Sequence, residues 1–436
     1  MNPGFIRFLL ALFILSLAAC NPATATQTPV QTAVPTPSAT LPAPDTSPAL
    51  TQEPAANPSP EVEGEVLIWL DWSVHELQIL ARVVEEFQAA FPGVDISVVY
   101  YPEDEIKERF IEATQAGNPP DVLIGPSIWT LDLWRQGLLR SINERIDPEI
   151  SEALVPLALQ QASLGSLIVA LPINMQGVVL YRNRDLVPSA SETMEQMVEE
   201  GGRLQEQDQI GVLLDFAFIN TGPIFSTCGA ELYTAEVELA ISEADLTCWW
   251  EALLTWSDVG EIIVNGEDDL LAFTQGESAW LLEASSQVDH VLESLKPEQL
   301  SIDPWPIYQA RERALAGYSW TQNAYFPAAS NAENFDAAWI FVRYLLTADV
   351  QRSFAEATAG RQFTVLRSLS VEERWLNEMN SALASNIPLP REPVFDLFRT
   401  NLDFEIEDVL VRETAIDFSI RRVLDNLNRD LSQGED

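Results

Sequence analysis

Hydrophobic and polar positions alternate from residue 66 onward in a pattern that predicts strands separated by helices. Residues 66–70 form a short apolar run, and Ser73 followed by Glu76 fits a capping box that opens a helix. Apolar residues spaced by three and four continue to Phe91, after which a Pro-Gly pair ends the helix. The pattern therefore predicts a strand followed by an amphipathic helix.

The same alternation continues with a strand at 94–100, a helix at about 103–116 and a buried strand at 122–124. This β-α-β-α-β series predicts a parallel sheet with helices on both faces. In such sheets ligands bind beyond the carboxyl ends of the strands, so the loops at 71–73 and 126–129 are expected to face one crevice.

Further along, strand-like segments at 168–171 and 177–181 are joined through residues 172–175, and no internal repeat is apparent. The remaining apolar patterns predict helices. These helices are expected at about 245–257, 268–275, 334–346 and 349–357, followed by a final stretch at about 406–431.

The first twenty residues have the layout of a signal peptide. Arg7 precedes an apolar run at 8–17, and two alanines stand directly before Cys20. A membrane-spanning helix would need about 20 apolar residues. The segment Leu17-Ala18-Ala19-Cys20 also resembles the bacterial lipobox, whose cysteine is lipidated after residues 1–19 are removed. We therefore expect an extracytoplasmic protein anchored to the cell membrane by an N-terminal lipid; the alternative is a plain signal peptide with an incidental cysteine.

Residues 20–64 are expected to form a disordered tether behind Cys20. The segment is rich in Thr, Ala and Ser, contains ten prolines and has almost no large apolar residue, so it cannot bury enough surface to fold. Proline at this density favours an extended chain of roughly 3.1 Å per residue. The rest of the chain is long enough for two lobes with separate cores.

The formal charge of −42, from 66 acidic and 24 basic residues, excludes partners that are themselves anionic, above all nucleic acid. Neither of the two lysines follows a glycine, so the phosphate-binding loop of ATPases is absent. With two histidines and no Gly-x-Ser-x-Gly turn, neither a His-rich metal site nor a hydrolase nucleophile is indicated. We expect no metal and no cofactor.

Cys228 and Cys248 remain as an even pair once Cys20 is assigned to lipid. In an oxidising compartment a disulfide is the natural interpretation, with two buried free thiols as the alternative. The bond would close a loop of about 20 residues and contribute roughly 3 kcal/mol.

The order of segments resembles the solute-binding proteins of ATP-driven (ABC) importers, specifically the maltose-binding, sugar-binding type. The similarity extends over nearly all of the chain from Glu65, and each motif is weak alone. Arg182 and Arg184 depart mildly from the family's Tyr-Asn-Lys-Asp-Leu. The matching segments are Val66-Leu67-Ile68-Trp69, Gly117-Asn118-Pro119-Pro120-Asp121-Val122, Gln136-Gly137-Leu138-Leu139, Leu171-Pro172-Ile173 through Leu186, Ala272 to Ala279 and Ala337 to Leu346.

The resemblance implies an α/β, two-lobed, periplasmic-binding-protein-like fold of type II. Each lobe would be a mixed, mainly parallel sheet flanked by helices, with the ligand cleft between the lobes. Lobe 1 is expected at 65–172 plus 320–366, and lobe 2 at 177–317 plus 370–436. The resemblance also implies a monomer that delivers its ligand to the transmembrane subunits of an ABC permease.

A sugar site needs flat aromatic platforms together with polar groups that bind hydroxyls. Trp72 and Trp129 follow strand ends, Trp280 lies where the family often places a stacking aromatic, and Trp320 lies at the return crossover. These four are the expected platforms, with core packing as the alternative. Core positions are favoured for Trp69, Trp134, Trp249, Trp256 and Trp339.

The expected polar partners share a position in or beside a loop or crossover that faces the proposed cleft. Arg391 is a further candidate, in a proline-rich stretch near the family's last cleft segment. The other candidates are Asp71, Ser127, Asn174, Gln176, Glu283 and Gln322.

The leading functional hypothesis is a non-catalytic receptor that binds a carbohydrate for import. The same fold could instead bind a polyol, a polyamine or a peptide, and the acidic balance makes a cationic ligand conceivable. A carbohydrate-active enzyme is the competing class, since glycosidases also combine carboxylates with aromatic subsites, but the sequence supplies no distinctive carboxylate pair.

Overall fold

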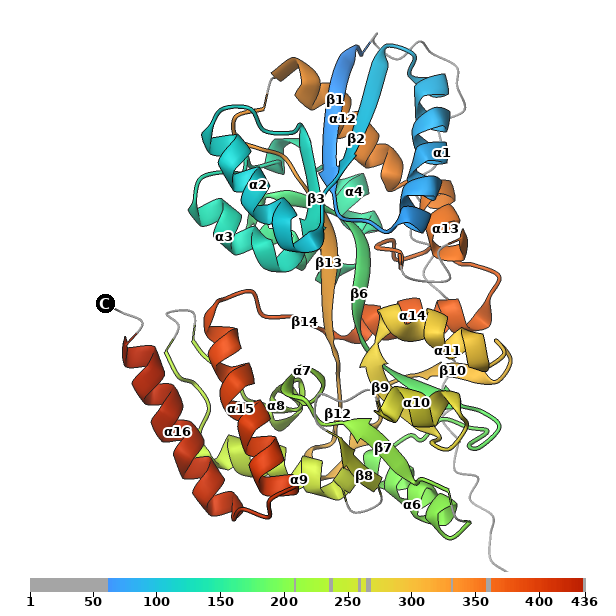
Figure 1. The fold of residues 1–436 in the computed structure, drawn as a ribbon, viewed down its shortest axis with the longest axis vertical. Helices are drawn as coiled ribbons and strands as arrows, with labels where there is room; N and C mark the ends of the chain where they lie inside the picture. The colour runs from blue at the N-terminus through green and yellow to red at the C-terminus, as the bar shows by residue number, and fades with distance from the viewer. Residues whose placement is uncertain are drawn as a thin grey trace, which may run out of the picture. The chain divides into compact units, whose positions relative to one another are not determined.

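A mixed sheet of eight strands runs through the described part of the chain, in the order β10-β6-β13-β3-β1-β2, with β14 beside β13 and β9 beside β6 (Figure 1). The computed structural model describes residues 62–207, 209–234, 238–257, 260–263, 268–330, 332–357 and 362–433. The predicted signal peptide, Cys20 and residues 20–61 of the predicted tether lie outside the described residues. The strands are β1 Gly64–Leu70, β2 Val94–Tyr100, β3 Val122–Pro126, β6 Ala170–Asn183, β9 Trp280–Ala284, β10 Leu300–Asp303, β13 Tyr318–Tyr325 and β14 Ile387–Pro388.

We call the part of the fold that is built on β1, β2 and β3 with their helices lobe 1. β1 pairs in parallel with both β2 and β3, which confirms the predicted β-α-β-α-β series. The predicted capping box is also confirmed, because Ser73 accepts from the Glu76 amide while the Glu76 carboxylate accepts from the Ser73 amide at 2.7 Å. The other elements of this lobe are α1 Val74–Ala90, α2 Glu103–Gln115, η1 Ser127–Trp129, α3 Thr130–Arg135, η2 Asn143–Arg145, α4 Pro148–Ala153, α5 Pro156–Gln161, β4 Ser163–Leu164, β5 Leu167–Ile168, α12 Ala332–Leu345 and α13 Ala348–Ala357.

Two long strands, β6 and β13, run side by side between the lobes (Figure 1). The first half of β6 pairs with β13, whose far end pairs with β3 of lobe 1. The second half of β6 pairs with β9 and β10. Where the sequence pattern predicts two strand-like segments, the structure has one strand, because residues 170–177 pair with β13 and residues 178–183 pair with β9 and β10.

Lobe 2 contains β9 and β10 and the helices around them. The final stretch at 406–431 contains the end of α15 Val394–Leu410 and most of α16 Ile416–Gln433, with Glu413 between the two helices at a positive φ of 59°. Cys228 and Cys248 are joined by a disulfide with Cα atoms 6.1 Å apart. The elements are α6 Met194–Gln205, β7 Val212–Asp215, α7 Phe218–Thr221, α8 Ile224–Cys228, α9 Glu243–Ser257, β8 Gly260–Ile263, α10 Asp268–Thr274, η3 Ser285–Gln287, α11 Val288–Ser294, β11 Ile307–Tyr308, η4 Gln309–Arg311, β12 Arg313–Ala314, α14 Arg374–Ser385, α15 Val394–Leu410 and α16 Ile416–Gln433.

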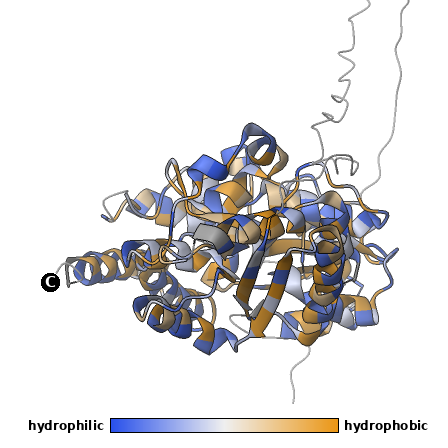
Figure 2. Cartoon of the chain, turned by 90° about the horizontal axis from the view of Figure 1, so that it is seen from above, coloured by the Kyte–Doolittle hydropathy of each residue, from blue (hydrophilic) through white to orange (hydrophobic). Residues whose placement is uncertain are grey.

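The central strands consist largely of hydrophobic residues, drawn in orange, and the helices around them alternate between hydrophobic and hydrophilic residues (Figure 2). The largest core extends from Val66 and Ile68 of β1 through Ile173 of β6 to Phe273 and Leu281 of lobe 2. A second core belongs to lobe 2 and includes the fully buried Trp249 and Trp250 of α9. The largest core is thus shared between the lobes.

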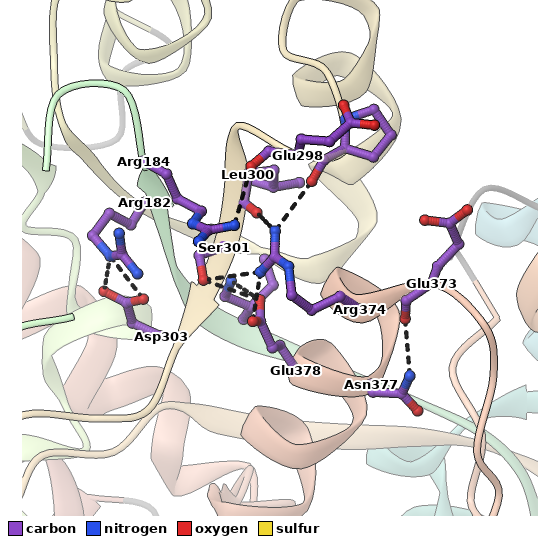
Figure 3. Close-up of polar contacts among 12 residues, drawn as sticks. Arg182, Arg184, Glu298, Leu300, Ser301, Asp303, Glu373, Arg374, Asn377 and Glu378 are labelled. Atoms are coloured by element: carbon purple, nitrogen blue, oxygen red, sulfur yellow. Dashed lines mark hydrogen bonds and ion pairs between the residues drawn. The ribbon is translucent and has the colours of Figure 1, made fainter. Parts of the chain in front are cut away.

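Arg182, which departs from the family motif, forms a buried ion pair (Figure 3). Its Nε donates to both carboxylate oxygens of Asp303 at 2.9 and 2.7 Å, and the two side chains are 5% and 3% exposed. Burial raises the pKa of Asp303, against the lowering effect of Arg182. The arginine that departs from the family motif is therefore paired with Asp303 of β10.

None of the helices that the structure describes is long and apolar enough to cross a membrane.

Candidate interlobe binding site

A cavity of about 340 Å³ is lined by residues from both lobes. Lobe 1 contributes η1 and α3, which follow β3, and one residue of α2; lobe 2 contributes the segment that leads into α15 and the first turn of α15. Two of the residues expected in the cleft, Trp129 and Arg391, are among the lining residues. The other lining residues are Lys107, Ile128, Leu131, Asp132, Arg135, Pro390, Glu392, Pro393, Phe395 and Asp396.

Trp129 supplies an aromatic surface on the lobe 1 side of the cavity. It ends the short helix η1 directly after β3, and it is 9% exposed, so most of the indole is packed. A Cβ atom placed on Gly125 would lie 2.2 Å from Cζ3 of Trp129. Glycine at this position thus allows the ring to lie on the backbone of β3. The remaining exposed edge, next to the exposed Ile128, is suited to contact with the apolar face of a ligand.

The charged groups on the cavity are mostly engaged with neighbours. Lys107 forms an ion pair with Asp132 at 2.6 Å, and this contact lowers the pKa of Asp132. Asp396 pairs with Arg399 at 3.0 Å. Glu392 accepts a hydrogen bond from the Tyr233 hydroxyl at 2.7 Å.

The crossing strands bring four more expected residues together. Trp320 is in register with Gln176, and Gln322 with Asn174, so all four side chains project from one face of the β6–β13 pair. The indole N–H of Trp320 donates to Oε1 of Gln176 at 3.1 Å. Trp320 and Gln322 are half-buried.

Buried amide oxygens on this face have no hydrogen-bond partner among the described residues, namely Oδ1 of Asn174 and Oε1 of Gln322. The Asn174 amide nitrogen donates to Gln362, whose own amide nitrogen donates to Glu76 at 2.7 Å. An unpaired buried acceptor costs about 1–3 kcal/mol. Groups that donate hydrogen bonds, such as ligand hydroxyls, would remove this cost.

Asp71 follows β1 and is half-buried. Burial raises the pKa of its carboxyl to about 6, with smaller contributions from Glu103 and Glu76 and an opposing hydrogen bond to its own backbone. Glu283 lies on β9, opposite Val179 of β6, and is also half-buried.

Two of the four expected platforms are core residues instead. Trp72 is 3% exposed and packs edge-on against Phe354 of α13 at 5.4 Å, because α13 returns over the end of β1. Trp280 is 0% exposed within the lobe 2 core, and its place in the apolar run of β9 could have indicated this. Neither presents a ring to a ligand in this structure. Of the tryptophans expected in cores, Trp134 is half-buried and the others are buried; these are Trp69, Trp249, Trp256 and Trp339.

Ser127 is also buried and forms a hydrogen bond within the protein. It is 1% exposed, and its hydroxyl oxygen accepts from the backbone N–H of Thr321 at 3.2 Å. Ser127 therefore joins η1 to β13.

Sequence reasoning missed several cavity residues, including Lys107 and Arg135 on helices and Phe395 on α15. Lys107 stands among acidic residues in α2, which is the pattern of a solvent-exposed helix face. No local signal therefore indicated that Lys107 lines a cavity. Among the described residues, no His, Cys, Asp or Glu side chains gather in a way that could hold a metal ion.

Comparison with protein families identifies the chain. Residues 82–369 match the model of the bacterial extracellular solute-binding protein family. The chain belongs to this family. The resemblance inferred from the sequence motifs is thereby confirmed, and the description of the family supports the predicted extracytoplasmic location. The family is one of binding proteins, which agrees with the expectation of a non-enzyme.

One sequence relative of this solute-binding protein is the maltotriose-binding protein of Pyrococcus abyssi, 28% identical over 136 residues. The match covers 31% of this chain and 30% of the relative, so the chain spans less than a third of that relative's length.

Solved structures show the same fold and confirm the predicted two-lobed class. The extracellular solute-binding protein of Staphylococcus aureus, in complex with maltose, has a TM-score of 0.73 at 15% identity and covers 84% of this chain and 98% of its own. The cyclic α-maltosyl-1,6-maltose binding protein of Arthrobacter globiformis has a TM-score of 0.71 at 17% identity and covers 85% and 100%.

Proposed function

We propose that this solute-binding protein captures a carbohydrate between its lobes and delivers it to the permease of an ABC importer. The observation that carries the proposal is the cavity of about 340 Å³, whose lining combines Trp129 with polar side chains from both lobes. An aromatic edge beside polar groups suits a sugar, whose C–H faces are apolar and whose rim consists of hydroxyls. The relatives named for maltose, maltotriose and a cyclic maltosyl sugar support this class of ligand.

The remaining parts of the proposal concern the organisation of the chain. Lobe 1 is proposed to comprise 65–172 plus 320–366, and lobe 2 to comprise 177–317 plus 370–436. A ligand that contacts both lobes would stabilise the closed state by its differential affinity for that state. A monomer held to the membrane by lipid on Cys20, with residues 20–64 as tether, would keep the captured ligand near the permease.

The test is isothermal titration calorimetry of the soluble protein from residue 62 onward. The panel consists of neutral mono- and oligosaccharides, polyols, polyamines and short peptides. We expect binding of at least one carbohydrate. Binding only of a polyol, polyamine or peptide, or of nothing in the panel, would count against a sugar ligand.

Trp129→Ala is expected to weaken carbohydrate binding about ten-fold, the equivalent of about 1.4 kcal/mol, because the aromatic surface on the cavity is lost. Trp134 lies on the following helix α3 and is not among the lining residues, so Trp134→Ala is the matched control and should bind like the wild type. Trp129→Phe, which keeps a ring, separates loss of stacking from loss of folding. Equal affinities of Trp129→Ala and the wild type would remove Trp129 from the site.

A further inference from the structure

Arg391 was expected to contact the ligand, but its guanidinium is engaged elsewhere. The residue lies between β14 and α15, in the segment that returns from lobe 2 to the cavity. Its Nη1 donates to the backbone carbonyl of Gln161 at 2.9 Å, and its Nη2 donates to the carbonyl of Ser163 at 2.8 Å. Both carbonyls belong to lobe 1. The side chain therefore bridges the two lobes beside the cavity.

The Gln161 carbonyl is available because helix α5 ends at this residue, and the Ser163 carbonyl follows in the short strand β4. The last carbonyls of a helix have no partner within it, and a cation near this end also interacts favourably with the helix dipole. Burial lowers the pKa of Arg391, which marks a guanidinium partly removed from water. In such a place a cation is stable only where its N–H groups find acceptors.

The side chain of Gln161 ties the same segment to the crossing strand. It is 1% exposed, and its amide nitrogen donates to the carbonyls of Ser319 on β13 at 3.2 Å and of Leu389 at 3.0 Å. The backbone N–H of Leu389 also donates to the Ser319 carbonyl at 2.8 Å. Residues 389–391 are thus bound to lobe 1 and to β13 at once.

The carbonyl of Gln161 also accepts from the residue that follows Trp129 and from the crossing strand β13. The Thr130 hydroxyl donates to it at 3.4 Å, and the Asn323 amide nitrogen at 3.2 Å. The Tyr325 hydroxyl, within 2.9 Å of the Thr130 hydroxyl, donates to the Pro126 carbonyl at 2.9 Å. One carbonyl therefore connects Arg391 with the residue next to Trp129.

We infer that Arg391 is a positioning residue, which holds residues 389–393 against the end of α5 and so sets the separation between this wall of the cavity and Trp129. The inference rests on the proposed function. It predicts that substitution of Arg391 changes the affinity for the ligand because residues 389–393 shift, and not because a contact between Arg391 and the ligand is lost.

Hydrogen–deuterium exchange of the ligand-free protein tests the placement directly. Arg391→Gln should accelerate exchange at least ten-fold in peptides covering 387–393 and 160–165, and Arg391→Lys, which keeps one donor group, should lie between it and the wild type. Arg367→Gln is the matched control, since Arg367 also donates to a backbone carbonyl, that of Leu154 at 2.8 Å, away from the cavity. It should leave both peptides unchanged.

Calorimetry with the carbohydrate that the wild type binds completes the test. Arg391→Gln should weaken binding about ten-fold, Arg391→Lys should recover part of the loss, and Arg367→Gln should match the wild type. Weaker binding with unchanged exchange would make Arg391 a direct ligand contact and overturn the inference. Faster exchange with unchanged affinity would overturn it as well. If the wild type binds no carbohydrate, the proposed function fails, and the exchange comparison alone decides the role of Arg391.

Discussion

The placement, hydrogen bonding and pKa of individual side chains at the site depend on their immediate neighbours. Gly125 allows Trp129 to lie on β3, because any Cβ there would overlap the indole ring. Asn174 and Gln322 each leave a buried oxygen without a partner among the described residues. Asp71 carries a carboxyl whose pKa is raised to about 6 by burial. Such groups are typical of binding sites, where polar atoms are arranged for a ligand.

Asp269 in lobe 2 offers a prediction at the scale of one residue. It is 0% exposed, burial raises its pKa to about 7, and its Oδ2 has no partner among the described residues. Because the folded protein binds this proton more tightly than the unfolded chain does, stability should fall as pH rises from about 4 to about 7. Above pH 7 the folded protein bears the full cost of the buried charge.

Asp269→Asn, which is neutral at every pH, is therefore expected to raise the free energy of unfolding at pH 8, by on the order of 2 kcal/mol after allowance for partial hydration. At pH 4 the gain should disappear. Urea unfolding at both pH values measures it, with the exposed Asp268→Asn as control. A gain of equal size at pH 4 and pH 8 would show that the carboxyl does not titrate as described.

Secondary-structure elements follow the sequence closely where their signals are local. The capping box places the start of α1, and the parallel pairing of β1 with β2 and β3 follows from the helices between them. The prediction fails where an element depends on distant partners. Strand β6 stays continuous because it pairs with β13 in one half and with β9 and β10 in the other.

The disulfide between α8 and α9 gives a prediction at the scale of elements. It closes a loop with a sequence separation of 20. The double variant Cys228→Ser/Cys248→Ser is expected to lose about 3 kcal/mol of unfolding free energy, because the unfolded chain regains the freedom that the bond removes. Urea unfolding with and without a reductant measures this loss. A reductant should destabilise the wild type and leave the variant unchanged; equal stability of oxidised and reduced wild type would contradict the prediction.

The whole molecule is held together by a core that does not stop at the lobe boundary. Val66 of lobe 1, Ile173 of the crossing strand and Leu281 of lobe 2 belong to the same cluster of buried residues. The largest core thus contains residues from both lobes. Because its side chains are closely packed, we expect the elements that carry them to unfold together.

Continuity of this core predicts a single thermal unfolding transition of the soluble protein despite its two lobes. Differential scanning calorimetry should give one peak whose calorimetric and van't Hoff enthalpies agree. Leu281→Ala should move this peak to lower temperature without splitting it, since the cavity left in the core destabilises both lobes. The resolution of two peaks in the wild type would show that the lobes unfold independently.

Sequence alone determined the features that depend on near neighbours or on residue counts. These are the alternation of strands and helices in lobe 1, the capping box of α1, the even pair of cysteines and the ordered motifs that indicated the family. The sequence also identified some site residues that the fold brings together. Trp129 and Arg391 line one cavity, and four crossover residues share one face of the β6–β13 pair, namely Asn174, Gln176, Trp320 and Gln322.

Tertiary structure decided what each of these side chains contacts. Whether Trp72 faces a ligand depends on α13, more than 250 residues along the chain, and the role of Arg391 depends on carbonyls 228 and 230 residues away. Local propensity acts over a few residues, whereas burial and hydrogen bonding are set by whichever segments the fold brings together. The pattern of a sequence therefore predicts its elements far better than the partners of its polar side chains.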